Sequence, residues 1–186
     1  MWNFTWQHGR QMAAAISGNT TITNSYDVDG IRDSKTVNGV THTYTTLSGK
    51  IIREAYGSTV IDYLYDNEGR PYKLIVNDNG TKYTGFYILN LQGDVIGIVD
   101  TNGVEAVTYE YDAWGKERSH SISGTNGSVF YSHNSLKYRG YYYDSDLGMY
   151  YLRSRFYDAE IGRFVNADNQ ISGASGNIND YNLYSY

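Results

Sequence analysis

The side chains that could do chemistry in this sequence are mainly carboxylates, because it has no cysteine and four histidines. The stretches Asp27-Val28-Asp29-Gly30 and Asp144-Ser145-Asp146 contain the beginning of a calcium-loop pattern, but no acidic residue follows at the spacing that such a loop requires. The histidines have no metal-ligand spacing; they are His8, His42, His120 and His133. No phosphate-binding loop, nucleophile elbow or zinc motif is present. We therefore expect no metal site and no cofactor.

The aspartates instead follow a repeat in which Tyr-Asp is followed within a few residues by glycine. The copies are Tyr26-Asp27 with Gly30, Tyr65-Asp66 with Gly69, Tyr111-Asp112 with Gly115, Tyr143-Asp144 with Gly148, and Tyr157-Asp158 with Gly162. An Asp side chain can bond the backbone of its own turn, and glycine accepts a positive φ, so each copy predicts a strand, a turn and a second strand. Related turns without the tyrosine end at Gly80, Gly93 and Gly103. This spacing is typical of a serially hairpinned sheet.

One hairpin is predicted in detail. Residues 20–26, 31–37 and 40–46 are predicted strands, and Asn38-Gly39 between the last two is typical of a type I′ turn, in which both central residues have positive φ. Strict pairing across this turn sets Val37 opposite Val40, Lys35 opposite His42 and Asp33 opposite Tyr44.

Alternation of apolar and polar residues continues along the chain and predicts which side chains share a strand face. The groups expected to share a face are Ile61, Tyr63 and Tyr65; Tyr72, Leu74 and Val76; and Val107, Tyr109 and Tyr111. Gly85 has no side chain, so it leaves room for an aromatic ring from a neighbouring strand. These groups favour strands with one buried face.

Helix signals are few and short. Residues 12–16 are alanine-rich, and residues 180–186 could form a turn or two. The stretch from Ser119 to His133 is rich in Ser, Gly, Asn and Thr, which predicts a loop or an irregular insertion. The sequence thus predicts an all-β fold, a twisted antiparallel β-ribbon of serial hairpins with little helix.

The composition limits the classes of function. The 21 tyrosines suit pleated, half-buried surfaces, and the net charge of −5 argues against a nucleic-acid partner, which needs a dominant basic face. No apolar run approaches the roughly 18 residues of a membrane span. The first residues, Trp2 to Trp6, already form a strand pattern, and residues 182–186 show no terminating cap. We therefore expect a slice of a longer repetitive array.

Three blocks near the end of the sequence are the most specific. They are Tyr138-Arg139-Gly140-Tyr141-Tyr142-Tyr143-Asp144, then Gly148-Met149-Tyr150-Tyr151-Leu152-Arg153-Ser154-Arg155-Phe156-Tyr157-Asp158, then Gly162-Arg163-Phe164. In this order they resemble the RHS-repeat-associated core of the RHS, or YD-repeat, family. The Tyr-Asp turns before them are similar to the RHS repeats that precede that core.

The resemblance implies a division into YD or RHS-type repeats at 1–118, a loop or irregular insertion at 119–135, and a core-like segment at 136–186. It implies a role as a structural segment of a shell that encloses and helps to deliver a C-terminal toxin. The implied partners are upstream RHS repeats and a downstream toxin domain of the same polypeptide, with a cognate immunity protein as a further candidate. The implied location is secreted or at the cell surface.

Related members of this family carry an aspartyl self-protease in the core, which needs two carboxylates that share one proton. The resemblance implies Asp158 and Asp168 as these carboxylates, with Arg155 or Arg163 beside them. Ala159 and Asn169 stand where many members have proline, and the family's cleavage stretch would come after Tyr186. The same aspartates also fit ordinary turn capping. We therefore expect the fragment alone to have no activity and, if it has any, to be an aspartyl autoprotease.

A hypothesis from another class is an aromatic β surface that binds cell-wall or host carbohydrate. Trp2, Trp6 and Trp114 would be its anchors. The exposure of these three rings separates this hypothesis from the structural one, because rings packed on neighbouring strands offer no platform to a sugar.

Overall fold

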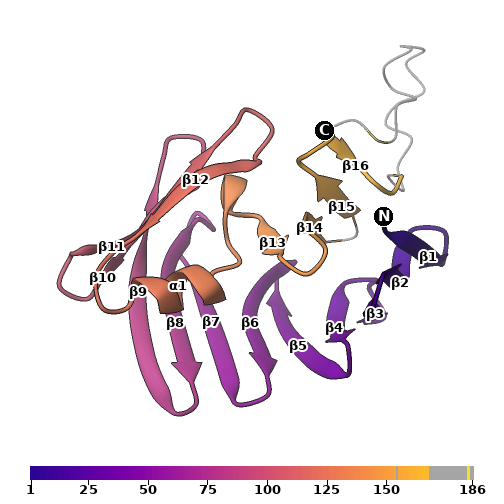
Figure 1. Ribbon diagram of the computed structural model, residues 1–186, viewed down its shortest axis with the longest axis horizontal. Helices are drawn as coiled ribbons and strands as arrows, with labels where there is room; N and C mark the ends of the chain where they lie inside the picture. Colours follow the sequence, from indigo (N-terminus) through magenta and orange to yellow (C-terminus); the bar gives the residue numbers. More distant parts are fainter. Residues whose placement is uncertain (154, 168–183, 185–186) are drawn as a thin grey trace.

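In the computed structural model, the structure describes residues 1–153, 155–167 and 184. Within these residues, twelve strands form one sheet in which each strand pairs antiparallel with its neighbours in the chain (Figure 1). The strands are β1 (Asn3–Gln7), β2 (Gln11–Ser17), β3 (Thr20–Tyr26), β4 (Arg32–Val37), β5 (Val40–Leu47), β6 (Lys50–Tyr56), β7 (Thr59–Tyr65), β8 (Pro71–Asp78), β9 (Thr81–Leu89), β10 (Val95–Asp100), β11 (Glu105–Tyr111) and β12 (Glu117–Ile122). The prediction of an antiparallel ribbon of serial hairpins is confirmed.

The chain after β12 folds back onto this ribbon. It forms the helix α1 (Gly127–His133), the 3-10 turn η1 (Tyr138–Gly140) and a second sheet. In the described part of the chain this second sheet has four antiparallel strands, β13 (Tyr142–Asp144), β14 (Met149–Leu152), β15 (Arg155–Asp158) and β16 (Arg163–Phe164). We call residues 136–153 and 155–167 the docked segment.

The hairpin between β4 and β5 has the predicted turn and register. Asn38 and Gly39 have φ values of 48° and 90°, as a type I′ turn requires, and Val37 lies opposite Val40. Lys35 lies opposite His42, as predicted. The ladder ends at Ser34 and Thr43, so the expected pair of Asp33 and Tyr44 lies just beyond it.

One predicted strand face is wrong in part. Leu74 and Val76 are buried, as expected, but Tyr72 is 53% exposed. A register shift between Leu64 and Tyr65 places Tyr65 opposite Pro71, and Pro71 is buried in its place. The bulge breaks the alternation at this point and turns the Tyr72 side chain outward.

Two local predictions were also wrong. Residues 12–16 form part of β2 rather than a helix, because β1 and β3 pair with them on both sides and this pairing overrides the helix preference of alanine. Residues 119–135 do not form an irregular loop: they contain the end of β12 and all of α1. Of the possible helix at residues 180–186, all but Tyr184 lies outside the described residues.

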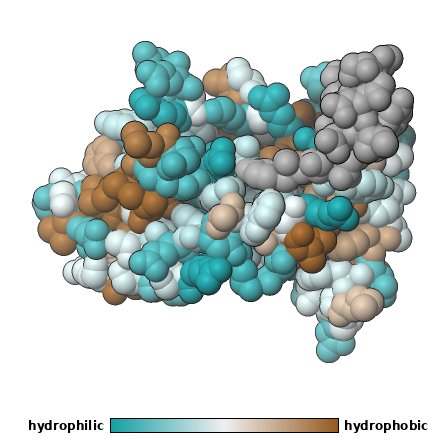
Figure 2. Space-filling view, turned by 90° about the horizontal axis from the view of Figure 1, so that it is seen from above, coloured by the Kyte–Doolittle hydropathy of each residue, from teal (hydrophilic) through white to brown (hydrophobic). Residues whose placement is uncertain are grey.

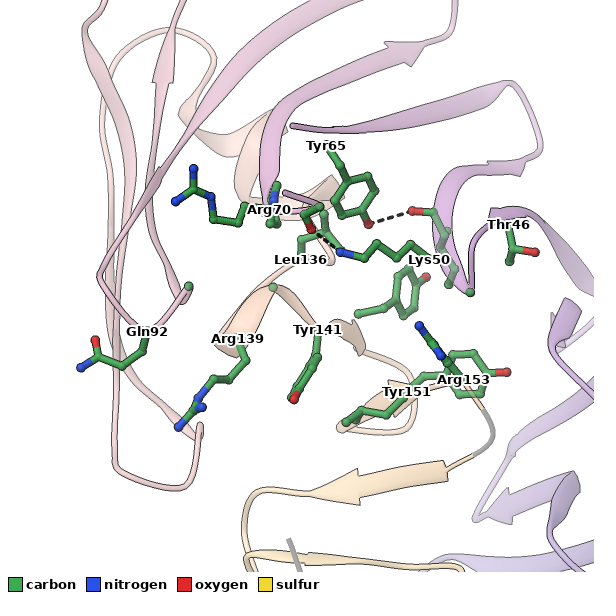
Figure 3. A pocket seen from close by; sticks show the side chains of 18 of the residues that line it. Thr46, Lys50, Tyr65, Arg70, Gln92, Leu136, Arg139, Tyr141, Tyr151 and Arg153 are labelled. Carbon is green, nitrogen blue, oxygen red and sulfur yellow. Dashed lines mark hydrogen bonds between the residues drawn. The ribbon is translucent and has the colours of Figure 1, made fainter. Parts of the chain in front are cut away.

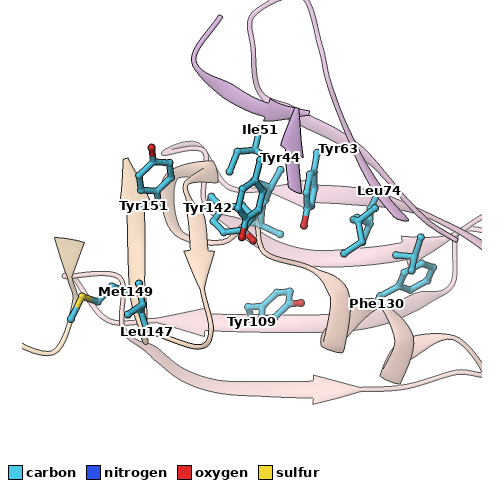
Figure 4. Packing of buried hydrophobic residues seen from close by; sticks show 14 of the residues in the cluster. Tyr44, Ile51, Tyr63, Leu74, Tyr109, Phe130, Tyr142, Leu147, Met149 and Tyr151 are labelled. Carbon is cyan, nitrogen blue, oxygen red and sulfur yellow. The ribbon is translucent and has the colours of Figure 1, made fainter. Parts of the chain in front are cut away.

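The hydrophobic core lies between the inner face of the ribbon and the returning chain. Figure 4 shows Tyr44, Tyr63 and Leu74 from the ribbon packed together with Tyr142 and Phe130 from the returning chain. As predicted, an aromatic ring lies over Gly85, but it belongs to Phe130 of α1 and not to a neighbouring strand. A Cβ built on Gly85 would lie 3.2 Å from Phe130 Cε1 and 2.6 Å from Ile98 Cγ2.

Hydrophilic and hydrophobic residues are mixed over the face shown in Figure 2, with a hydrophobic group near the end of the ribbon that carries β10 to β12. The exposed apolar residues near that end include Val104 and Ile122. None of the helices in the described residues is long and apolar enough to cross a membrane.

Candidate functional site

The repeat turns share one geometry. At Asp27, Asp66 and Asp112, the carboxylate Oδ1 accepts hydrogen bonds from the backbone N–H groups two and four residues later, at 2.8 to 3.0 Å. The glycines that follow, Gly30, Gly69 and Gly115, have φ values of 78°, 79° and 89°. Each side chain therefore replaces a backbone acceptor inside the turn, and the glycine closes the turn without strain.

Asp144, in the fourth Tyr-Asp copy, lies in a different environment from the three turn aspartates described above. Its side chain is fully buried, and its Oδ2 accepts a hydrogen bond from Arg32 Nη1 at 2.6 Å. Its Oδ1 accepts one from Lys35 Nζ at 2.8 Å, and Lys35 Nζ also reaches Asp146 Oδ2 at 2.7 Å. Within its own turn, Oδ1 accepts only a long bond of 3.4 Å from the Leu147 N–H. Asp144 therefore joins the docked segment to β4 through a buried ion cluster.

The opposite charges in this cluster stabilise the ionised forms of its side chains. Burial alone would raise the pKa of Asp144, but Arg32 and Lys35 outweigh it and hold the pKa at about 2. Burial would also lower the pKa of Lys35, yet Asp144 keeps it above the ordinary value. The Arg32 guanidinium lies over the rings of Tyr44 and Tyr151, at 4.8 and 4.5 Å from their centroids. Both cations are therefore charged in the folded protein at neutral pH.

A second polar group lies next to this cluster, around Glu54 of β6. The Glu54 side chain accepts hydrogen bonds from Tyr142 Oη at 2.8 Å and from Tyr63 Oη at 3.5 Å, and it pairs with His42 Nδ1 at 2.8 Å. The His42 ring stacks on Tyr56 at 4.2 Å between centroids, and Tyr56 Oη contacts His133 Nδ1 at 2.9 Å. These partners satisfy a buried carboxylate that would otherwise be costly, and they join β5 and β6 to the returning chain.

Three tyrosine hydroxyls fasten the docked segment to the turn between β11 and β12. Tyr138, Tyr157 and Tyr150 donate to the carbonyl oxygens of three consecutive turn residues, Ala113, Trp114 and Gly115, at 2.9, 2.8 and 2.7 Å. Lys116 of the same turn pairs with Glu160 at 2.7 Å. At the other end of the ribbon, Asn166 Nδ2 donates to the Arg10 carbonyl in the turn between β1 and β2. The docked segment thus contacts both the first and the last hairpin of the described ribbon.

The Gly115 contact gives a matched test of this docking. We expect Gly115→Ala to destabilise the fold more than Gly103→Ala, although both glycines have positive φ in the same kind of turn. Both variants have about 1 to 2 kcal/mol of backbone strain. Only at Gly115 would the new Cβ meet another side chain, since it would overlap Cδ1 of Tyr138, whereas nothing lies within 4 Å at Gly103.

The extra cost at Gly115 is about 1 to 3 kcal/mol, the usual range for overpacking, and urea unfolding of both variants measures it. Equal losses at the two glycines would show that Tyr138 does not press on this turn in solution.

The structure gives no distance between Asp158 and Asp168, the two carboxylates proposed for self-cleavage. Asp168 lies outside the described residues. Asp158 Oδ1 accepts a hydrogen bond from the Glu160 N–H at 2.8 Å, which is the turn-capping arrangement. The Arg155 guanidinium lies over the Phe164 ring, 3.7 Å from its centroid. In the described residues, no cluster of His, Asp or Glu is arranged to hold a metal ion.

The three tryptophans lie on two elements. Trp2 and Trp6 flank Phe4 on or next to β1, with ring centroids 6.5 and 6.0 Å from that of Phe4. Trp2 is half-buried and Trp6 is 37% exposed. Trp114 is 55% exposed, and its ring lies against Gly162 of the docked segment. Among the described residues, no ring contact joins Trp114 to the row on β1.

The residues that hold the docked segment from the ribbon side were missed by sequence reasoning. They are Arg32, Lys35 and Glu54, and each is at least 95% buried. The available signal was weak: Arg32 and Lys35 lie within the strand predicted at residues 31–37, where a charged side chain usually points outward, and no strand was predicted around Glu54.

Comparison with known proteins gives sequence relatives that are much longer. The chain is 36% identical over 168 residues to the tRNA3(Ser)-specific nuclease WapA of Bacillus spizizenii, a match that covers 88% of this chain and 7% of the relative. It is 35% identical over the same length to the tRNA nuclease WapA of Bacillus subtilis. The double-stranded DNA deaminase toxin A of Burkholderia cenocepacia is 33% identical over 100 residues, covering 50% of this chain and 6% of the relative. No family model matches the chain.

Among solved structures, the crystal structure of TcdB2-TccC3-TEV matches 99% of this chain with a TM-score of 0.74 and 17% sequence identity. The crystal structure of TcdB2-TccC3 matches the same share with a TM-score of 0.71. This chain covers 9% and 10% of those chains. It is therefore similar in sequence to a short stretch of the WapA nucleases, and it has the fold of a short stretch of the TcdB2-TccC3 chains.

Proposed function

We propose that this chain is a wall segment of an RHS-type shell that encloses a toxin located further along the same polypeptide. The observation that carries the proposal is the docked segment, which returns across the inner face of an open hairpin ribbon and fastens to its first and last turns. Two sequence relatives, a tRNA-specific nuclease and a double-stranded DNA deaminase toxin, differ in the activity that their names give, and this chain matches 7% and 6% of their lengths. The shared part is therefore a candidate for a common container.

The edges of the ribbon support a place within a longer wall. Among the described strands, β1 pairs only with β2, and β12 pairs only with β11. An open strand edge exposes backbone donors and acceptors and invites aggregation unless it is paired or covered. In a wound sheet, upstream repeats would pair with β1, and residues 1–118 would continue that winding into the core-like segment at 136–186.

The proposed role is structural. The described contacts of the docked segment are packing, ion pairs within the fold and hydrogen bonds to turn carbonyls, so this segment would hold the wall closed beside its contents. The partners proposed are upstream RHS repeats and the downstream toxin, with an immunity protein that recognises that toxin. The proposed location of the whole polypeptide is outside the cell or at its surface.

Protease protection of the full polypeptide tests this role. We expect the region after this chain to resist limited proteolysis as long as the wall is intact, and to become accessible when Asp144→Asn loosens the docked segment. Asp62→Asn is the control, because the Asp62 pair with Arg53 lies on the surface. A downstream region cut equally fast in the unmutated protein and in the Asp144→Asn variant would contradict containment.

Release of the toxin by Asp158 and Asp168 stays a prediction from the family resemblance. We expect Asp168→Asn in the full polypeptide to abolish any self-cleavage, since one carboxylate cannot act as both acid and base. Mass spectrometry of the purified product measures this. An uncleaved product in the unmutated polypeptide would eliminate this reaction without affecting the role of the wall.

A further inference from the structure

A cavity of about 530 Å³ opens between one row of ribbon turns and the docked segment (Figure 3). The ribbon contributes the turns after β5, β7 and β9, and the docked segment contributes η1, the two tyrosines that follow it and the end of β14. The volume is within the range of ligand sites for small molecules.

Aliphatic side chains from both sides line this cavity. They are Ile31, Ile51, Pro71 and Leu91 of the ribbon and Leu136 and Leu152 of the docked segment. An apolar group that filled the space would remove these side chains from water, which is favourable. The cavity is therefore suited to a ligand with an apolar body.

The hydroxyl groups of three lining tyrosines are bonded within the fold. Tyr65 Oη donates to a carbonyl of β6 at 2.9 Å, and Tyr142 Oη donates to the buried Glu54 carboxylate at 2.8 Å. Tyr151 Oη accepts the Arg32 N–H at 2.7 Å. None of these hydroxyls needs a ligand as a partner, so the rings add to the apolar character of the space.

Two cationic side chains meet the cavity next to the turn between β5 and β6. Lys50 Nζ donates to the Gly69 carbonyl and lies 5.0 Å from the centroid of the Tyr65 ring. Arg153 Nη2 donates to the Ser48 carbonyl at 3.4 Å. In the part of the chain that the structure describes, no carboxylate pairs with either cation, and no Asp or Glu lines the cavity. Both positive charges therefore lack a counter-ion there.

The other two cations of the lining are engaged elsewhere. Arg70 pairs with two carboxylates of its own turn. The Arg139 guanidinium lies over the Tyr138 ring, 5.4 Å from its centroid. In Figure 3, Lys50 and Arg153 lie on one side of the cavity and Arg139 lies on the other. The uncompensated charge is thus concentrated at the end next to the turn between β5 and β6.

We propose that this cavity binds an amphipathic monocarboxylate, a small molecule with one carboxylate head and an aliphatic body. The carboxylate would pair with the Arg153 guanidinium and the Lys50 ammonium, which are charged donors without a counter-ion. The aliphatic body would lie along the apolar side chains and tyrosine rings of the lining. This binding site is independent of the proposed role as a wall segment and of the toxin that the shell encloses.

Isothermal titration of this chain with octanoate and octanamide tests the site, because the two probes share an aliphatic tail and differ in the charge of the head. We expect one octanoate site per chain, with an affinity about tenfold or more above that of octanamide, since only octanoate forms charged hydrogen bonds. Hexanoate should bind more weakly than octanoate, by roughly fourfold for each methylene removed.

The variant Lys50→Gln with Arg153→Gln should lower the octanoate affinity to that of octanamide and leave the octanamide affinity unchanged, because it removes the charges and keeps the apolar lining. Arg118→Gln is the matched control: it removes a cation on β12, outside the lining residues, and should change neither affinity. Circular dichroism first checks that the double variant is folded. Arg153→Gln alone, at an exposed residue, replaces it if it is not.

The absence of saturable octanoate binding would overturn the proposal. Equal affinities for octanoate and octanamide in the unmutated chain would overturn it too, and so would an octanoate affinity that is the same in the double variant and in Arg118→Gln. Equal binding of hexanoate and octanoate would show that the apolar lining does not hold the tail, which also contradicts the proposal.

Discussion

Replacing Asp144 with asparagine is expected to lower the free energy of unfolding by about 3 to 5 kcal/mol, because it leaves buried positive charge without its counter-ion. Arg32 and Lys35 are at most 2% exposed at their side chains, and Asp144 lies within 2.8 Å of both. Asp146 is 34% exposed and pairs with Lys35, and no ion pair joins it to Arg32 among the described residues, so it cannot replace Asp144 for Arg32. Chemical denaturation of the variant and the unmutated chain measures the loss.

The control for this variant is Asp62→Asn, which removes the carboxylate of a surface pair with Arg53. Its cost should be about 1 kcal/mol or less. Replacing the cluster as a whole, with Asp144→Leu, Arg32→Met and Lys35→Met together, should recover much of the loss, since no buried charge then remains uncompensated. Similar losses for Asp144→Asn and Asp62→Asn would show that the docked segment does not depend on this cluster.

The same carboxylate predicts a pH dependence. Because the pKa of Asp144 in the folded protein is about 2, below its ordinary value, its contribution to stability is complete above the ordinary carboxyl pKa and is lost as the pH falls toward 2. Between about pH 4 and pH 2, the unmutated chain should lose more stability than Asp144→Asn. Parallel stability curves for the two proteins over this interval would contradict the assignment.

The second large effect is expected at Phe130, whose ring fastens α1 to the ribbon. Phe130→Ala should lower the free energy of unfolding by about 3 to 5 kcal/mol, because it removes a fully buried ring and leaves a cavity. Phe130 is 0% exposed and lies over Gly85 of β9. Hydrogen exchange should also show faster exchange of the amides of α1, since this short helix depends on packing.

Val28→Ala is the control for Phe130→Ala, because Val28 is fully exposed in a turn. We expect its effect to be within about 0.5 kcal/mol. A loss for Phe130→Ala that is no larger than this would mean that α1 does not pack on the ribbon as described.

The ribbon could be predicted from the sequence because its signals are local. An Asp with a glycine three residues later specifies the turn at Asp27, Asp66 and Asp112, and the side-chain bonds that form lie within four residues of the Asp. Alternation between turns then fixes the buried face at Ile61 and Tyr63. The error at Tyr72 arose at a bulge, whose extra residue leaves no sign in a period-two pattern.

The attachment of the docked segment could not be predicted, because its partners are far apart in the sequence. Asp144 lies 112 residues from Arg32, and the Tyr-Asp repeat gave it the same signature as the aspartates that cap their own turns. The stretch from Ser119 to His133, which contains Phe130, predicts a loop because it is rich in Ser, Gly, Asn and Thr. The helix α1 packs on the ribbon through residues such as Phe130, whose ring lies over Gly85, and these two residues are far apart in the sequence.

Electron cryomicroscopy of the full polypeptide that contains this chain tests the central proposal most directly. We predict a hollow shell in which an upstream strand pairs with β1, the docked segment lies against the inner face of the ribbon, and density for the downstream region lies inside. A β1 edge exposed to solvent, with the downstream region folded outside the sheet, would contradict the account.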